Sequence, residues 1–166
     1  MAEIPTDIGN ATEVDLDGIL ELQEVNQMAR GGTLSARLSR ERIAAMMNAM
    51  PLIVAHSDGR ITGFLMTTTR EMNADLPIVQ AMFAAYQGAA DAYVYGPICV
   101  EVAERGKGVA QAMFTELRRL EPGREGILFI RRDNAASLRA HARMGMREVA
   151  EFQFNGFDFA VFSYVG

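Results

Sequence analysis

The sequence predicts a single α/β domain, spanning residues 1–166, in which helices and strands are intermixed along the chain. Two observations predict this class. Apolar residues recur at helical spacing in several stretches, and short runs of β-prone residues lie between them, two pairs of which are joined by Asp-Gly or Asn-Gly. A chain of this length buries roughly 70% of the surface that it exposes when unfolded. We therefore expect one core that needs neither disulfides nor a metal.

Two helices are predicted in the first third of the chain. The first covers about 15–27, where apolar residues follow helical spacing and acidic residues occupy the first turn. The glycine pair at 31–32 then favours a loop. Ser39 is placed to cap a second helix over about 39–48, and the proline that follows ends it.

A hairpin is predicted after these helices. Residues 52–56 and 60–69 are β-prone, and the Asp58-Gly59 pair between them favours a tight hairpin turn. A weaker pattern over about 8–12 indicates a further strand before the first helix.

The second half of the chain predicts the remaining helices and strands. The stretch 71–91 has apolar residues at helical spacing and is interpreted as a helical segment between two strands. After it we expect a strand over 92–102 that Gly96-Pro97 interrupts, a helix over 109–120, a strand over 126–131, a helix over 135–144, and aromatic strands over 146–154 and 157–164 joined by Asn155-Gly156. Since proline cannot donate a hydrogen bond to a neighbouring strand, the strand over 92–102 is expected to open at Gly96-Pro97.

The composition excludes several classes of protein. Apolar residues make up 49% and charged residues 22%, which excludes a wholly disordered or collagen-like chain. No apolar stretch approaches the ~18 residues of a membrane helix. The single Cys99 excludes an intramolecular disulfide, two histidines make no metal cluster, and the acidic N-terminus lacks a signal-peptide pattern. We therefore expect a cytoplasmic protein without a metal.

The charge of the chain is unevenly distributed. The net charge is −5, but residues 105–147 hold 10 of the 16 basic residues and only 4 of the 21 acidic ones. This segment carries +6 and the rest of the chain −11. Such a segment either binds something anionic or forms a solvated arginine-rich face.

The sharpest motif is the glycine loop, residues Arg105 to Ala110, between a predicted strand and a predicted helix. Two glycines let backbone N–H groups approach a ligand, and a helix N-terminus favours phosphate. It is not a P-loop, because Lys107 is followed by Gly108 instead of serine or threonine. It is not a dinucleotide fingerprint either, because Gln111 stands where a third small residue is required.

The loop resembles the pyrophosphate loop of the GNAT N-acetyltransferases, whose pattern is Gln/Arg-x-x-Gly-x-Gly/Ala. Arg105, Gly108 and Ala110 occupy its defining positions. The strand end Ile98-Cys99-Val100 and the segment from Asn134 to Met146 are similar to further family motifs, with Gly145 as the glycine that ends the helix. The resemblance covers nearly the whole chain and implies the GNAT fold, a mixed central sheet with splayed strands flanked by helices.

The resemblance also implies acetyl-coenzyme A as the acetyl donor, and the segment of charge +6 agrees with its phosphates. The implied contacts are the following residues: Ile98, Cys99, Val100, Arg105, Gly106, Lys107, Gly108, Val109, Ala110, Asn134, Ser137 and His141. The splayed strands of the family bind the pantetheine arm through the backbone, so we expect side chains in the strand to matter little.

The catalytic residues are less well defined than the cofactor contacts. Many relatives protonate the leaving thiolate with a tyrosine seven residues after the asparagine, and here that position is His141. Asn134, Ser137 and His141 share one helix face, so the imidazole could replace the tyrosine, or Ser137 or water could take the role. The strand carboxylate that serves as base in some relatives is absent, which leaves Glu101 or a water relay.

The acceptor is expected to be an amine of a small molecule or a peptide. The charge of −11 outside the basic segment favours a cationic amine, whereas Arg30, Arg37 and Arg40 could bind a carboxylate. The alternative is a coenzyme-A-binding module without catalysis, suggested by His141 in place of tyrosine. Nucleic-acid binding is not expected, because no aromatic residues interleave the basic run. The aromatic last strands could support a homodimer.

Overall fold

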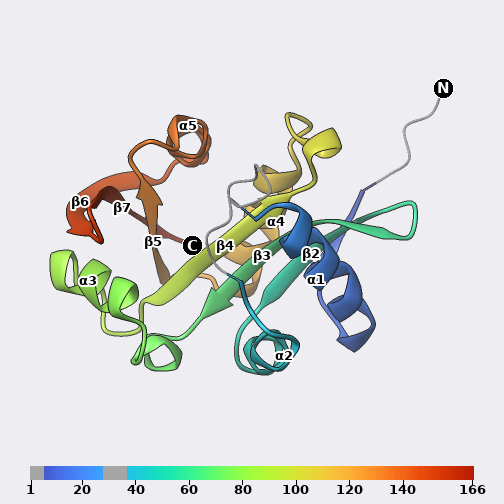
Figure 1. Ribbon diagram of the computed structural model, residues 1–166, viewed down its shortest axis with the longest axis horizontal. Helices are drawn as coiled ribbons and strands as arrows, with labels where there is room; N and C mark the ends of the chain where they lie inside the picture. The colour runs from blue at the N-terminus through green and yellow to red at the C-terminus, as the bar shows by residue number, and fades with distance from the viewer. Residues whose placement is uncertain (1–5, 28–36) are drawn as a thin grey trace. The chain divides into compact units, whose positions relative to one another are not determined.

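The computed structural model describes residues 6–27 and 37–166. Helices and strands are intermixed along the chain, as the sequence predicts (Figure 1). The elements are β1 (Asp7–Asn10), α1 (Leu16–Val25), α2 (Arg40–Ala49), β2 (Leu52–Ser57), β3 (Arg60–Thr68), α3 (Pro77–Ala85), β4 (Tyr93–Val100), α4 (Val109–Leu120), β5 (Glu125–Arg131), α5 (Ala135–Arg143), β6 (Arg147–Phe154) and β7 (Phe157–Val165). Among these described helices, none is long and apolar enough to cross a bilayer.

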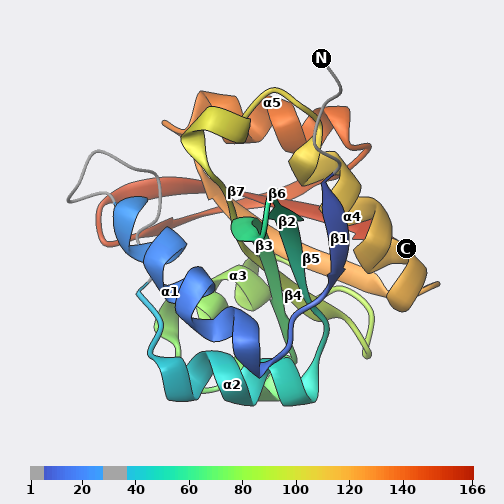
Figure 2. The same ribbon diagram turned by 90° about the vertical axis from the view of Figure 1, so that its right-hand side faces the viewer.

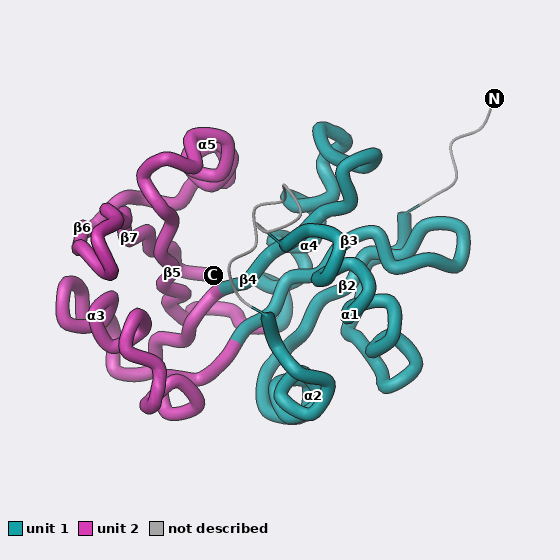
Figure 3. The backbone as a smooth tube through the Cα atoms, in the orientation of Figure 1, with its two compact units in different colours: residues 1–67, 96–120 teal, residues 68–95, 121–166 magenta. Residues whose placement is uncertain are grey.

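The chain divides into two compact units (Figure 3). Unit 1 comprises residues 1–67 and 96–120, and unit 2 comprises residues 68–95 and 121–166. The strand order is β1-β2-β3-β4-β5-β7-β6, a mixed sheet in which β4 and β5 are parallel. Strand β4 contributes residues to both units. That the two units form one domain stays a prediction.

In unit 1, strands β1, β2 and β3 are antiparallel neighbours, and α4 contacts β1 and β2 (Figure 2). The predicted Asp58-Gly59 turn is confirmed, because both residues have positive φ, 53° and 73°. Helix α4 also lies close to β3 at Gly63, where a Cβ atom would come within 3.3 Å of the Val109 side chain. Glycine at this position lets α4 approach the sheet.

Helices α1 and α2 of unit 1 lie side by side (Figure 2). The predicted cap of α2 is confirmed, because the Ser39 hydroxyl accepts a hydrogen bond from the Arg42 N–H at 3.1 Å. The first predicted helix begins instead with the 3-10 turn Glu13–Asp15, which passes into α1. The weak strand pattern near residue 8 corresponds to β1.

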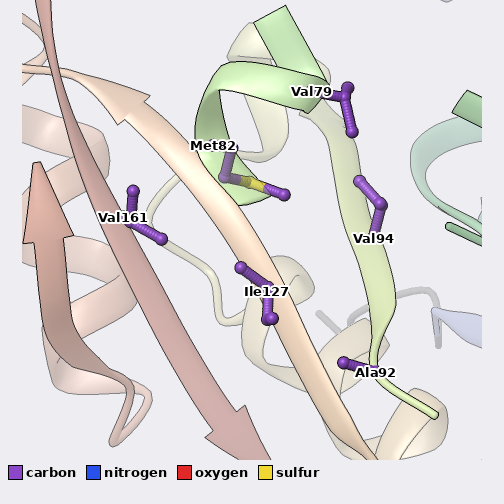
Figure 4. Packing of buried hydrophobic residues seen from close by; sticks show 6 residues of the cluster. All are labelled: Val79, Met82, Ala92, Val94, Ile127 and Val161. Atoms are coloured by element: carbon purple, nitrogen blue, oxygen red, sulfur yellow. The ribbon is translucent and has the colours of Figure 1, made fainter. Parts of the chain in front are cut away.

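In unit 2, strands β5, β7 and β6 are antiparallel, and α3 packs against them. Figure 4 shows the buried cluster at this contact. Its members come from α3, β5, β7, β4 and the residue before β4, and they are Val79, Met82, Ala92, Val94, Ile127 and Val161. The helical interpretation of 71–91 is confirmed only for α3 and the 3-10 turn Glu71–Asn73. Pro77 begins α3, since proline is favoured in the first turn of a helix.

Glu125 joins the connection after α3 to the sheet of unit 2. Its carboxylate accepts hydrogen bonds from the Tyr86 hydroxyl (2.7 Å), the Ala89 N–H (2.6 Å) and the Ser163 hydroxyl. Burial favours the neutral acid, but these three donors outweigh it, so the pKa of Glu125 lies below its usual range. The carboxylate therefore stabilises the fold of unit 2 in its ionised form.

The Glu125→Ala substitution is expected to lower the free energy of unfolding by about 3 kcal/mol, at roughly 1 kcal/mol for each lost hydrogen bond. Chemical denaturation measures this change. As a control, Glu151→Ala removes a carboxylate from an exposed ion pair with Arg132 and is expected to cost less than about 1 kcal/mol. Equal losses in the two variants would contradict the role given to Glu125.

Candidate functional site

The glycine loop, residues 105–110, connects β4 to α4 in unit 1 through the 3-10 turn Val102–Glu104. Gly106 and Gly108 have φ values of 79° and 82°, in the left-handed region that favours glycine. Both are exposed, and a Cβ atom added to either would meet no atom of residues 6–27 or 37–166 within 4 Å. Open space therefore lies beside the loop, at the helix end whose first N–H groups have no partner within the helix.

Arg105 ties the glycine loop to two neighbouring elements of unit 1. Its Nε donates to the Val100 carbonyl at 3.0 Å, and its Nη2 donates to Asn26 Oδ1 at 2.9 Å. Asn26 is buried and donates in turn to the Leu22 carbonyl of α1. Neither of these partners is a carboxylate, so these two hydrogen bonds do not neutralise the positive charge of Arg105. The sequence analysis did not identify Asn26, which is 79 residues away from Arg105.

Five of the nine other basic residues of the positive segment are paired with carboxylates. Lys107 Nζ lies 3.4 Å from Glu104. Four arginines are in ion pairs within their own unit: Arg119 with Glu116, Arg124 with Glu121, Arg131 with Asp133, and Arg132 with Glu148 and Glu151. Glu116, Glu121 and Asp133 are already included in the charge of +6, so only the pairs with Glu104, Glu148 and Glu151 reduce the positive charge further.

The end of β4 carries the three strand residues that the resemblance implies as cofactor contacts. Ile98 and Val100 are half-buried, whereas Cys99 is buried. Burial raises the pKa of the Cys99 thiol to about 11, so this thiol is neutral and unreactive at pH 7. Just after the strand, the Glu101 carboxylate accepts two hydrogen bonds from Arg60, at 2.8 and 3.0 Å.

Helix α5 of unit 2 begins and ends as its sequence predicts. The Asn134 side chain accepts a hydrogen bond from the Ser137 N–H at 3.2 Å and so caps the helix. At the other end Gly145 has a φ of 92°, and the Met146 N–H bonds the His141 carbonyl at 3.2 Å. These two termini fix the position of Ser137 and His141 between them.

His141 lies inside unit 2 with both ring nitrogens bonded. Nδ1 lies 2.8 Å from the Ser137 carbonyl oxygen and 3.2 Å from the Ser137 hydroxyl, while Nε2 lies 3.1 Å from the Tyr95 hydroxyl. Only 4% of the residue is exposed. Burial lowers the pKa of His141 below its ordinary value, and the bond to the Ser137 carbonyl opposes this only partly. The imidazole is therefore neutral at pH 7.

Tyr95 is the partner that sequence analysis missed. It lies on β4, shares a strand face with Tyr93, and is only 4% exposed. Burial also raises the pKa of Tyr95, so its hydroxyl stays protonated. The available signal was a tyrosine inside a buried strand, since a buried hydroxyl requires a hydrogen-bond partner. Its partner is 46 residues away and could not be identified from spacing.

The lowered pKa of His141 makes stability depend on pH. As the pH falls below about 6.5, the unfolded chain binds a proton at this histidine before the folded chain does, so the free energy of unfolding decreases. His141→Gln removes this contribution. We expect the wild type to lose more stability than the variant between pH 7.5 and 5.5, measured by urea denaturation. Equal losses would show that folding does not depress the pKa of His141.

Searches of protein-family models and of curated protein sequences found no match for this chain. Solved structures do match over nearly the whole chain. A GNAT-family acetyltransferase from Streptococcus agalactiae is 16% identical with a TM-score of 0.74 and covers 97% of this chain and 95% of its own. A ribosomal-protein-alanine N-acetyltransferase from Brucella melitensis is 20% identical with a TM-score of 0.68, and the match covers 96% of this chain and 99% of the Brucella chain.

A third match is a putative acetyltransferase from Salmonella typhimurium, solved with its cofactor acetyl-CoA. It is 17% identical, has a TM-score of 0.68, and covers 97% of this chain and 94% of its own. The mixed seven-stranded sheet with helices agrees with these structures. The chain therefore has the fold of the GNAT N-acetyltransferases.

Proposed function

We propose that the protein is an acetyl-CoA-dependent N-acetyltransferase. The observation that carries this proposal is the exposed glycine loop at the N-terminus of α4, within a chain that has the GNAT fold over nearly its whole length. A structure of the same fold contains acetyl-CoA. Fold alone does not establish an activity, so the residues must also suit the donor.

The glycine loop suits the diphosphate of acetyl-CoA. Among the described residues no atom lies within 4 Å of a Cβ atom added to Gly106 or Gly108, and the first N–H groups of α4, which have no partner within the helix, can donate to phosphate oxygens. Neither hydrogen-bond partner of Arg105 is a carboxylate, whereas Lys107 lies 3.4 Å from the Glu104 carboxylate. We propose residues 105–110 as the diphosphate site.

The pantetheine arm is proposed to bind the backbone of β4. Ile98, Cys99 and Val100 would offer N–H and C=O groups to an extended chain, as an added strand does. We further propose Asn134, Ser137 and His141 of α5 as contacts for the thioester end, following the resemblance. Glu101 is proposed to hold Arg60 and not to act as the base, because both of its oxygens accept from that guanidinium.

Acetyl-CoA supplies the acetyl group. The protein binds acetyl-CoA, orients its thioester and moves protons. A neutral amine attacks the carbonyl carbon, so one proton must leave nitrogen and one must reach sulfur. A neutral His141 can accept and return a proton, provided that a path leads to its ring.

The acceptor is proposed to be an amine of a small molecule or a peptide. The Brucella structure is named for acetylation of a ribosomal-protein alanine, which is a peptide acceptor. Arg37 and Arg40 pair with Glu24 and Asp17 of α1, which weakens the argument that they bind a carboxylate. Arg30 lies outside the described residues. A homodimer and a cytoplasmic location stay predictions.

A second candidate is a coenzyme-A-binding module without catalysis. The observation that favours it is that both ring nitrogens of His141 are already bonded within unit 2. The two functions are distinguished by measuring the release of free thiol from acetyl-CoA in the presence of candidate acceptors. The panel of acceptors comprises spermidine, kanamycin, a lysine peptide and a peptide with N-terminal alanine. The enzyme is expected to release thiol with at least one amine. Calorimetric binding of acetyl-CoA with no thiol release from any amine would favour the binding module.

A further inference from the structure

Asn26, the residue that follows α1, has a buried amide that bonds two different parts of unit 1. Only 3% of the residue is exposed. Its Nδ2 donates to the Leu22 carbonyl at 3.0 Å, and its Oδ1 accepts from Arg105 Nη2 at 2.9 Å. A guanidinium can only donate and a carbonyl can only accept, so these two partners fix which end of the amide is oxygen. The bond to α1 therefore directs the amide oxygen at Arg105.

The guanidinium of Arg105 is held at two of its nitrogens. Nε donates to the Val100 carbonyl at 3.0 Å, and Nη2 donates to Asn26. A guanidinium has five N–H groups, so these two bonds leave three. Within residues 6–27 and 37–166 those three form no hydrogen bond, and Arg105 is exposed. The first residue of the glycine loop thus combines a fixed guanidinium with donors that a ligand can use.

Both anchors of Arg105 are neutral, since one is a backbone carbonyl and the other an amide. In the part of the chain that the structure describes no carboxylate pairs with Arg105, whereas Lys107 of the same loop lies 3.4 Å from Glu104. An amide accepts from a guanidinium without cancelling its charge, which an aspartate would do. The charge acts on the end of β4, because burial raises the pKa of the Cys99 thiol and Arg105 opposes this effect.

We propose that Asn26 is a positioning residue of the diphosphate site, which holds Arg105 at the glycine loop and leaves its charge available to the diphosphate of acetyl-CoA. This inference rests on the proposed function. A long side chain loses freedom when it binds a ligand, and this loss lowers the affinity. Because Asn26 and Val100 order Arg105 in the folded chain, part of that loss occurs before the ligand binds.

Asn26→Ala removes one anchor of Arg105. We expect the Kd of acetyl-CoA, measured by isothermal titration calorimetry, to rise about tenfold, which is the order of the cost of fixing one such side chain on binding. The matched control is Gln23→Ala. Gln23 is also 3% exposed, and its amide exchanges two hydrogen bonds with the Leu38 backbone, at 2.9 and 2.8 Å. Its loss removes a buried amide from the same helix without touching Arg105, so the Kd is expected to stay within about twofold.

Asn26→Asp separates the hydrogen bond from the charge. Aspartate keeps an oxygen for Arg105 and, like alanine, cannot donate to the Leu22 carbonyl. Its negative charge would cancel the charge of the guanidinium, so we expect acetyl-CoA to bind at least about tenfold more weakly. The Kd is also expected to rise less with added sodium chloride than that of the wild type. An anchor that only maintained the shape of the loop would leave the affinity of this variant near that of the wild type.

Two further measurements test whether Asn26 acts through Arg105 and the diphosphate. In an Arg105→Ala background, Asn26→Ala is expected to change the Kd by less than about twofold, because the residue on which it acts is gone. With S-acetylpantetheine, which has the thioester arm without the diphosphate, kcat/KM is expected to be equal for Asn26→Ala and the wild type. With acetyl-CoA it is expected to fall about tenfold. A loss of folded protein would lower kcat/KM for both donors alike.

The outcomes separate the two proposals. A wild type that binds acetyl-CoA and an Asn26→Ala variant that binds it equally tightly would overturn the role of Asn26 alone. An equal effect of Asn26→Ala with and without Arg105, or wild-type affinity in Asn26→Asp, would overturn it as well. If Asn26→Ala does not fold, Asn26→Asp carries the test. A wild type that does not bind acetyl-CoA would overturn the proposed function, and the role of Asn26 with it.

Discussion

The Gly108→Asp variant is expected to bind acetyl-CoA at least about 100-fold more weakly than the wild type. Gly108 has a φ of 82°, and its missing side chain leaves open space at the start of α4. An aspartate there would place a negative charge where we propose the diphosphate to bind. Juxtaposed like charges cost several kcal/mol, and about 1.4 kcal/mol corresponds to each tenfold loss of affinity. Isothermal titration calorimetry measures the change.

The control for this variant is Gly123→Asp. Gly123 follows α4, has a φ of 75°, and likewise has no atom of the described residues within 4 Å of an added Cβ atom. Both substitutions therefore impose a similar backbone strain, and both add one carboxylate. We expect Gly123→Asp to bind acetyl-CoA as the wild type does, with a similar melting temperature for the two variants. Retained affinity in Gly108→Asp would exclude the glycine loop as the diphosphate site.

His141→Ala is expected to lower the rate of acetyl transfer more than about tenfold, which is a conservative figure for a group that handles protons in catalysis. The imidazole holds the Tyr95 hydroxyl at 3.1 Å and provides the one basic nitrogen of the pair. Affinity for acetyl-CoA should change little, because His141 is only one of the proposed contacts and is not part of the proposed diphosphate site. Initial rates of thiol release and calorimetry measure the two quantities.

The second histidine of the chain provides the control. His56 Nε2 lies 2.8 Å from the Asp15 carboxylate. Both residues belong to unit 1, whereas His141 belongs to unit 2. We expect His56→Ala to reduce stability slightly and to leave the rate per folded molecule unchanged. An equal loss of rate in the two variants would indicate a general effect of destabilisation instead of a role for His141.

Local signals in the sequence predicted much of the fold. Ser39, Asp58-Gly59 and Gly145 each act through their immediate neighbours, and each has the predicted role in the structure. The stretch 71–91 was predicted less well. Its apolar spacing extends beyond the helix, because Tyr86 and the residues after it are held by Glu125, a contact that spacing along the chain does not reveal.

The candidate site was predicted in part for the same reason. The glycine loop is a contiguous motif and was identified directly, whereas the capping of α5 by Asn134 was not predicted. The partners of Arg105 and His141 were not, because Asn26 and Tyr95 are 79 and 46 residues away from them. The sequence indicated that residues 105–147 carry excess positive charge, and the structure shows that Arg132 of this segment pairs with Glu148 and Glu151 outside it. Charge along a chain does not reveal such pairing.

The most direct test of the proposed activity is transfer of a trideuterated acetyl group from labelled acetyl-CoA, followed by mass spectrometry of the same four-amine panel. The proposal predicts that at least one amine gains the labelled acetyl group in the presence of the wild-type protein and not in the presence of Gly108→Asp. Labelling of no amine, or equal labelling with both proteins, would contradict it.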